Sequence, residues 1–362
     1  TDAINLDGGG SSCMYVKGET STYGAGVANQ PSDGTVRSVP NGIYVKKGTR
    51  TVNQFPGGIT SANFWISADQ TIAQGLTTNS NKQVTRLRDR MQRAAIDLYA
   101  YNGNPAPVNS IGGALNAYPA FVFKNYGAIQ SGRDLRIGTF AVVAKLKENE
   151  TLMSISEPDS TQYTADRYVL KTENGKIYSN DGSSTSPLGV ASTSGLFNAY
   201  QLFYVSFGEA GDSFRINGIN QNTTMSDSWK RKYVNGKLFL GAWVPYSWTS
   251  TTNSSFSGNL VEAFAFPGAL SDSERFRLES YLAIKYQLNI AEQGSGKTSS
   301  EKGRNYLLSN GKIIYARNEN FHHFINFVVK DDVSGLDVNS YSSTLSPELS
   351  SASAVLSIQH GS

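Results

Sequence analysis

Cysteine and histidine are scarce in this sequence. The single cysteine, Cys13, excludes an internal disulfide and a cysteine-based zinc site. The three histidines, His322, His323 and His360, all lie near the C-terminus, so the long central region has no histidine base for a Ser-His-Asp triad. No Gly-x-Ser-x-Gly nucleophile motif is present either. These absences argue against a serine hydrolase.

Charge is also low, at 17% of residues against about 25% in an average globular domain. The 32 basic and 29 acidic residues are scattered, apart from a run of arginines at 86, 88, 90 and 93, and this predicts no nucleic-acid partner. No apolar run approaches the ~18 residues of a membrane span, which predicts none. Residues 1–15 lack the basic start and apolar core of a signal peptide, as expected of a mature, cleaved or truncated chain.

What the sequence does have favours β structure. It contains 35 Gly, 19 Tyr and 17 Phe, and short Tyr/Phe/Val segments alternate with Gly/Asn/Ser turns. This pattern predicts an all-β fold, an antiparallel β-sandwich. The clearest alternation falls in five segments: 120–124, 139–145, 201–206, 237–240 and 260–266.

Two helices and one hairpin are predicted from local signals. Ser271 and Glu274 form a capping box before apolar residues at helical spacing, which predicts a helix ending near Tyr286. A second helix is predicted over residues 84–99. Asn310-Gly311 between two apolar segments predicts a β-hairpin.

Residues 2–14 read DAINLDGGGSSCM, and residues 29–41 continue with NQPSDG, Arg37 and Asn41. These motifs resemble the end of the catalytic domain in phosphodiester glycosidases, the family of the mannose 6-phosphate uncovering enzyme. The resemblance implies catalytic roles for Asp7, Ser11, Ser12 and Arg37, provided that the rest of that domain precedes Thr1. Cys13 replaces the usual threonine. The alternative is a tight glycine turn in an incomplete domain.

The segments FPGGI at 55–59, NFWISAD at 63–69, FRING at 214–218 and ESYLAIKY at 279–286 resemble bacterial laminin-G-like jelly rolls of the concanavalin A-like type. This resemblance implies a jelly-roll sandwich with one short C-terminal helix and flanking β segments. Residues 305–362 resemble the start of a second β module that follows such jelly rolls.

The resulting domain prediction has five parts. They are a glycosidase-like remnant at 1–47, a linker at 48–56, the jelly roll at 57–290, a linker at 291–304 and the start of a second β module at 305–362.

Aromatic residues near the end of the jelly roll are candidates for ligand binding. Trp243, Tyr246 and Trp248 cluster ahead of a Thr/Ser/Asn-rich loop, and Trp229 is a further candidate. Aromatic faces stack on sugar rings, so the segment favours a glycan or cell-surface polysaccharide, although packing over the sandwich is the alternative.

Metal and acid–base sites are less well supported. No metal site is predicted, although jelly rolls of this type bind Ca²⁺ through loop acids, for which Asp134, Asp159 and Asp212 are the candidates. The paired carboxylates of a glycosidase are not recognisable, since Glu262 lies alone on a late strand.

The sequence thus predicts a non-catalytic glycan-binding or adhesion region of a larger, secreted or bacterial surface protein that assembles into a larger complex. Two alternatives stay open. The chain belongs to a phosphodiester glycosidase whose catalytic body lies upstream, or to a phage fibre or receptor-binding protein of a virion. Whether the parent is an enzyme, and which ligand it binds, stay open as well.

Overall fold

The computed structural model describes residues 15–21, 24–27, 54–70, 74–91, 96–101, 107–115, 118–124, 127–156, 167–180, 187–192, 197, 199–207, 213–221, 233–242, 256–293, 301–316, 325–338 and 356–359. The chain divides into two compact units, residues 1–49 and 50–362. In the first unit, β1 (Tyr15–Ser21) and β2 (Gly24–Val27) form an antiparallel pair. All other described elements belong to the second unit.

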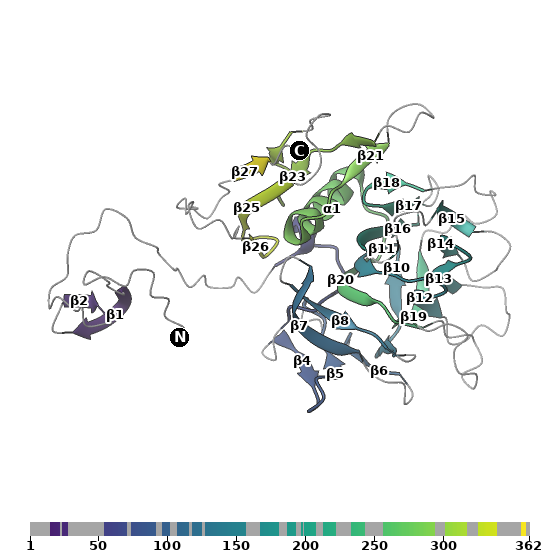
Figure 1. Cartoon of the computed structure of the whole chain (residues 1–362), viewed down its shortest axis with the longest axis horizontal. Helices are drawn as coiled ribbons and strands as arrows, with labels where there is room; N and C mark the ends of the chain where they lie inside the picture. Colours follow the sequence, from purple (N-terminus) through teal and green to yellow (C-terminus); the bar gives the residue numbers. More distant parts are fainter. Residues whose placement is uncertain are drawn as a thin grey trace. The chain divides into compact units, whose positions relative to one another are not determined.

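Two large antiparallel sheets form the main body of the second unit, so the fold is an all-β sandwich as predicted (Figure 1). The ten-stranded sheet has the order β15-β14-β13-β12-β19-β9-β6-β5-β4, with β10 pairing β19 beside this path. Its strands are β4 (Leu76–Thr78), β5 (Val84–Leu87), β6 (Leu98–Ala100), β9 (Ile129–Ser131), β10 (Leu135–Ile137), β12 (Thr151–Ser156), β13 (Arg167–Glu173), β14 (Lys176–Asn180), β15 (Pro187–Ser192) and β19 (Val234–Leu240).

The eight-stranded sheet has the order β18-β17-β16-β11-β20-β8-β7, and β3 also pairs with β20. Its strands are β3 (Phe64–Ser67), β7 (Val108–Leu115), β8 (Tyr118–Val122), β11 (Thr139–Lys145), β16 (Tyr200–Ser206), β17 (Ser213–Ile216), β18 (Ile219–Asn220) and β20 (Asn259–Phe266). The five segments with the clearest alternation in the sequence therefore lie in β8, β11, β16, β19 and β20, which confirms that prediction.

An Asn-Gly pair makes one tight connection in each of the two sheets. Asn174 and Gly175 join β13 to β14 with φ angles of 50° and 70°, and Asn217 and Gly218 join β17 to β18 with 50° and 85°. Two successive left-handed residues match the twist of the flanking strands, which is why asparagine and glycine occupy these positions.

Apolar side chains fill two layers. The first cluster lies between the sheets and includes Phe64, Phe140, Ile155 and Leu238. The second lies on the other side of the eight-stranded sheet, where Trp65, Phe264 and Leu282 pack together. Strand β20 is buried on both faces because it contributes to both layers, as a central strand covered by a helix must.

The helix α1 (Asp272–Tyr286) covers the outer side of the eight-stranded sheet (Figure 1). Ser271 caps its first turn, and the side chain of Glu274 accepts a hydrogen bond from the Ser271 backbone N–H at 2.9 Å. Gln287 ends the helix in the left-handed conformation, with φ 54°. The predicted capping box and the predicted end near Tyr286 are both confirmed.

The cap gives a first testable result. Ser271→Ala is expected to lower the free energy of unfolding by about 1 kcal/mol, because the backbone N–H of Glu274 loses its acceptor. Urea denaturation followed by tryptophan fluorescence measures the change. Ser273→Ala is the matched control, because Ser273 is an exposed serine in the first turn of the same helix. Equal stability of the two variants would contradict a role for the cap.

The helix predicted over residues 84–99 is wrong. Residues 84–87 form β5 and residues 98–100 form β6, and these two strands pair with each other. Val84 and Leu87 do have helical spacing, but both are buried in the sandwich as ends of a short strand. Pairing with neighbouring strands has overridden the local pattern.

The C-terminal strands pack beyond α1 (Figure 1). They are β21 (Ala291–Gln293), β22 (Glu301–Gly303), β23 (Tyr306–Leu307), β24 (Ile313–Tyr315), β25 (Ile325–Asp331), β26 (Leu336–Val338) and β27 (Leu356–Gln359). Strands β23 and β24 form the predicted hairpin around Asn310-Gly311. The segment predicted as a linker, 291–304, begins and ends in the paired strands β21 and β22. Tyr306, Tyr315 and Phe327 belong to the same apolar cluster as α1.

Candidate functional site

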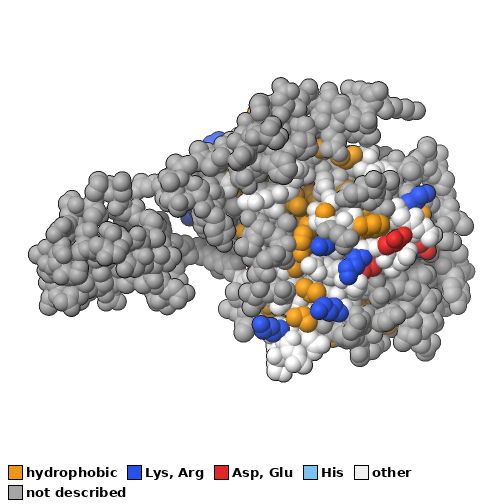
Figure 2. Space-filling view, in the orientation of Figure 1, with side chains coloured by type: hydrophobic (Ala, Val, Ile, Leu, Met, Phe, Trp, Pro, Cys, Tyr) orange, Lys and Arg blue, Asp and Glu red, His pale blue; other side chains and the backbone are white. Residues whose placement is uncertain are grey.

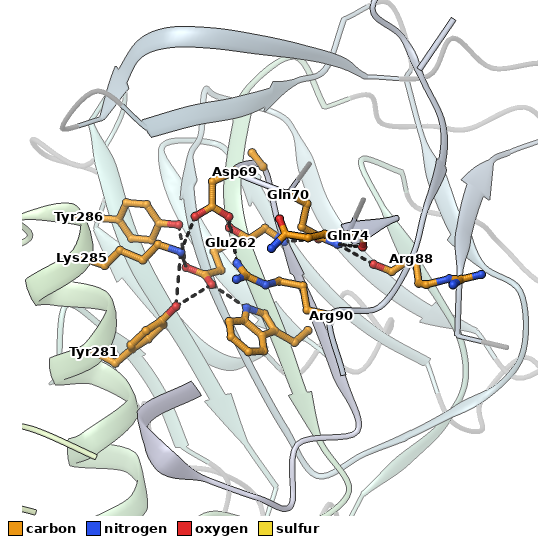
Figure 3. Close-up of polar contacts among 12 residues, drawn as sticks. Asp69, Gln70, Gln74, Arg88, Arg90, Glu262, Tyr281, Lys285 and Tyr286 are labelled. Atoms are coloured by element: carbon orange, nitrogen blue, oxygen red, sulfur yellow. Dashed lines mark hydrogen bonds and ion pairs between the residues drawn. The ribbon is translucent and has the colours of Figure 1, made fainter. Parts of the chain in front are cut away.

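A group of polar side chains lies between the eight-stranded sheet and α1, and we call it the carboxylate cluster (Figure 3). Its members are Trp65, Ser67, Asp69, Arg90, Glu262, Tyr281, Lys285 and Tyr286.

Local geometry explains how Glu262 on β20 meets Tyr281 and Lys285 on α1. The pairing of β11 with β20 shifts register between Val143 and Ala144, so Val261 is an extra residue in β20. Such a bulge re-aims side chains, and Glu262 points towards α1. Tyr281 and Lys285 are four residues apart on the helix and therefore share the face that meets Glu262.

Both oxygens of Glu262 are fully engaged. Oε1 accepts hydrogen bonds from the Trp65 indole N–H at 2.6 Å and the Tyr281 hydroxyl at 3.0 Å. Oε2 accepts from the Tyr286 hydroxyl at 2.7 Å and from Lys285 Nζ at 3.1 Å. The side chain of Glu262 has no exposed surface, so these four donors replace its hydration.

Asp69 is the second carboxylate of the cluster. Its Oδ1 accepts hydrogen bonds from Ser67 Oγ at 2.6 Å and Arg90 Nη1 at 3.0 Å, and its Oδ2 lies 3.1 Å from Lys285 Nζ. Burial alone would raise its pKa, but the charges of Lys285 and Arg90 outweigh this and hold the pKa of Asp69 well below its usual range. Asp69 is therefore ionised at neutral pH.

The side chain of Gln70 fixes the turn that carries Asp69. Its Oε1 accepts a hydrogen bond from the Ser67 backbone N–H at 2.9 Å, and its Nε2 donates to the carbonyl oxygens of Arg88 at 2.9 Å and Gln74 at 3.2 Å. Figure 3 shows these contacts beside the cluster. The turn that carries Asp69 is thus held both by nearby residues and by the more distant Arg88.

The two tyrosines are donors in this cluster. Burial, and then the negative charge of Glu262, raise the pKa of Tyr281 and of Tyr286 well above the usual value. Arg90 stacks on Trp65 with its guanidinium carbon 4.2 Å from the ring centre. Two carboxylates and two cations therefore balance in charge within an aromatic enclosure.

This arrangement differs from the acid–base pair of a glycosidase. Such an enzyme needs one protonated carboxylic acid and one carboxylate facing a sugar, whereas both carboxylates here hold internal cations and hydroxyl donors. The sequence places Glu262 on a late strand without a second carboxylate in a glycosidase motif, and in the structure Lys285 links it to Asp69. The sequence contained one signal of this contact, the helical spacing of Tyr281 and Lys285.

A second region of interest is the outer face of the ten-stranded sheet. Residues paired directly across strands point to the same face, and one such row crosses five strands. It runs through Arg86, Tyr99, Gln130, Phe239 and Ser154. The buried residues Leu87, Leu98 and Leu238 alternate with it on the inner face. We call this set the outer row.

The outer row combines an exposed ring with polar groups. Tyr99 is 41% exposed, which is unusual for a large aromatic side chain in the described part of the chain. Arg86 Nε donates to Asp97 Oδ2 at 2.7 Å and holds the guanidinium beside Tyr99. Gln130 Oε1 is shielded from solvent without a hydrogen-bond donor.

A second aromatic surface lies on the same face. Arg136 pairs with Asn235. Asn235 and Phe239 are four residues apart on β19, so both point to the same face of the sheet. The Arg136 guanidinium carbon lies 3.8 Å from the ring centre of Tyr233, a residue that is 36% exposed. The outer face thus offers two flat, partly exposed rings, each beside a guanidinium.

The site residues predicted from the sequence lie outside the described residues. These are Asp7, Ser11, Ser12 and Arg37 in the first unit, and Trp229, Trp243, Tyr246 and Trp248 in the second. Their roles stay predictions. The segment 243–248 begins one residue after Ala242, which packs with Phe239 and Tyr101 on the outer face.

The described residues contain no group of three or more His, Cys, Asp or Glu side chains able to hold a metal ion. Asp134, a predicted calcium candidate, is exposed, while Asp159 and Asp212 lie outside the described residues. Within the part of the chain that is described, no helix is long and apolar enough to cross a membrane. On the side shown in Figure 2, basic side chains are spread out, with hydrophobic side chains between them.

Comparison with known families gives two matches. Residues 1–46 match the phosphodiester glycosidase family, as the sequence motifs predict. Residues 274–354 match a domain of unknown function, DUF8202, and this range includes most of α1 and the strands β21 to β26. A comparison with curated proteins found no match. The narrower laminin-G-like assignment and the domain boundaries stay predictions.

Several solved structures are similar to the chain at low identity. The CBM40 module of the Ruminococcus gnavus IT-sialidase, bound to α2,3-sialyllactose, is 16% identical over 39% of this chain and 80% of that one, with a TM-score of 0.31. The Bacillus licheniformis β-glucanase is 11% identical over 57% and 99%, with a TM-score of 0.34. The Trypanosoma rangeli sialidase with sialic acid is 12% identical over 62% and 33%, with a TM-score of 0.35.

Proposed function

We propose that this chain is a non-catalytic glycan-binding region of a larger, secreted or surface-exposed protein, and that the outer face of its ten-stranded sheet binds the glycan. The observation that carries the proposal is the outer row, in which an exposed tyrosine ring lies between a guanidinium and an amide. Aromatic faces stack on the C–H surfaces of sugars, while planar polar groups bond their hydroxyls.

Three further observations support a polysaccharide ligand. The first unit matches a family that acts on glycosyl phosphodiesters, so a neighbouring glycan-binding region would keep such an enzyme near its substrate. The aromatic segment 243–248 continues the chain directly from the apolar group on the outer face. Arg136 and Lys237 place positive charge on this face, which favours an anionic glycan.

The test is a glycan array with the whole chain, followed by calorimetric titration of the best oligosaccharide. Tyr99→Ala is expected to weaken binding by about tenfold, because the stacking ring is lost. Tyr99→Phe keeps the ring and should retain most of the affinity. Ile313→Ala, which removes a 49% exposed side chain from the C-terminal hairpin, is the distant control. Unchanged affinity of Tyr99→Ala would contradict a site on this face.

A second candidate function rests on the family match of residues 1–46. In this alternative the chain contributes one wall of a phosphodiester glycosidase site, with Asp7, Ser11, Ser12 and Arg37 as its polar groups. Glycine residues 8–10 would let backbone N–H groups approach a phosphate closely. Hydrolysis of a glycosyl phosphodiester by the complete parent protein, and its loss in Asp7→Asn, would support this alternative.

A further inference from the structure

The carboxylate cluster brings together the three groups needed to make an amide bond. Lys285 Nζ lies 3.1 Å from Asp69 Oδ2 and 3.1 Å from Glu262 Oε2. From this geometry we infer that Lys285 and Asp69 join in an intramolecular isopeptide bond, with Glu262 as the proton carrier. The bond is a covalent modification of the folded chain and needs no external reagent.

Lys285 and Glu262 are held away from water. Their side chains are 5% and 0% exposed, and the Lys285 nitrogen lies within 5.2–5.7 Å of the ring centres of Tyr118, Tyr281 and Tyr286. Asp69 is ionised at rest and its side chain is 26% exposed, so the reacting form is a minor one, in which a proton has passed from Nζ to Oδ2 along their contact and left a neutral amine and a neutral acid. The fixed contact also replaces a bimolecular encounter.

The contacts of Asp69 give its two carboxylate oxygens different roles in the proposed reaction. Arg90 Nη1 and Ser67 Oγ both donate to Oδ1, whereas Oδ2 faces the amine. When Nζ attacks Cγ, the electron pair of the C=O bond moves to Oδ1, where a guanidinium and a hydroxyl stabilise the negative charge. Oδ2 is then the oxygen that leaves.

Glu262 completes the proton transfers. Its Oε2 takes one proton from the attacking nitrogen and gives it to the Oδ2 hydroxyl, which leaves as water. The C=O bond to Oδ1 forms again as the water departs. In total, one ammonium and one carboxylate become one amide and one water, and Glu262 returns to its initial state. The remaining charges, on Glu262 and Arg90, still balance.

The position of the bond gives it a structural consequence. Asp69 follows β3 by two residues, and Lys285 lies in the last turn of α1. The amide would close a covalent loop around every strand from β4 to β20. A crosslink over such a long loop restricts the unfolded chain strongly.

The experiment is an intact mass of the whole folded chain, followed by tryptic peptide mapping. The expected mass is lower than the sequence mass by one water. Trypsin should release residues 51–82 joined to residues 278–297, because a modified Lys285 resists cleavage. A chain with the full sequence mass overturns the proposal. So does a water loss that maps to residues 51–82 alone, which would indicate a succinimide.

Two variants assign the roles. Lys285→Arg keeps the cation but lacks the amine, so its full mass and its slower migration than wild type on a denaturing gel are expected. Glu262→Gln should also stay unlinked, and circular dichroism checks that it folds. A joined peptide in Glu262→Gln would overturn the role of Glu262 as proton carrier. The mass of the wild-type chain decides the bond itself, whatever the stability of the variants.

Discussion

Replacing Glu262 with alanine is expected to lower the free energy of unfolding by about 3–5 kcal/mol. The change leaves Lys285 with an unbalanced charge and removes the acceptor of three buried donors, on Trp65, Tyr281 and Tyr286. Removing one partner from a buried ionic network costs this much because the other groups stay in the interior without compensation.

The measurement is a urea denaturation curve, in which tryptophan fluorescence monitors the main unfolding transition. The intact mass of each sample is measured in parallel. Glu173→Ala is the matched control, since Glu173 is half exposed and pairs with Lys171 at 2.9 Å on the surface. That control should change stability by no more than about 0.5 kcal/mol. If the two alanine variants unfolded alike, Glu262 would not hold the helix to the sheet.

The second large effect is expected at Gly138, which lies where the start of β11 meets the end of β20. A Cβ atom built on Gly138 would lie 2.4 Å from the Cα of Gly268, which is backbone and cannot rotate away. Gly138→Ala must therefore displace the chain at the ends of β11 and β20, two central strands of the eight-stranded sheet. We expect a loss of about 1–3 kcal/mol in the free energy of unfolding.

Gly268→Ala provides the matched control for this prediction. A Cβ atom on Gly268 meets nothing within 4 Å, although the two glycines contact each other. The variant should unfold within about 0.5 kcal/mol of the wild type. Thermal denaturation compares the three proteins directly, and a Gly138→Ala variant as stable as Gly268→Ala would show that the backbones separate at little cost.

The sequence predicted those parts of the fold that depend on neighbouring residues. Ser271 and Glu274 defined the start of α1, and Asn310-Gly311 defined a hairpin, because caps and turns require particular residues at fixed spacing. Alternation located β16 and β20 because each strand has one side chain in two on each face. Residues 84–99 were predicted wrongly because short strands resemble one turn of an amphipathic helix.

The carboxylate cluster could not be predicted in the same way. Asp69, Arg90, Glu262 and Lys285 come from four separate segments, and only the pairing of β3 with β20 and the packing of α1 bring them together. The bulge that turns Glu262 towards the helix has no recognisable sequence signature. The outer row likewise depends on the register of β5, β6, β9 and β19.

The first and last elements of the sandwich are neighbours in space. Strand β3 pairs with β20, α1 packs on that same strand, and Gly57, just before β3, lies so close to the helix that a Cβ there would be 2.9 Å from the backbone of Arg277. A domain whose two ends meet can be inserted into a loop of a host protein with little distortion of either. This sandwich is therefore suited to modular exchange, in which one polypeptide acquires or loses it as a single cassette.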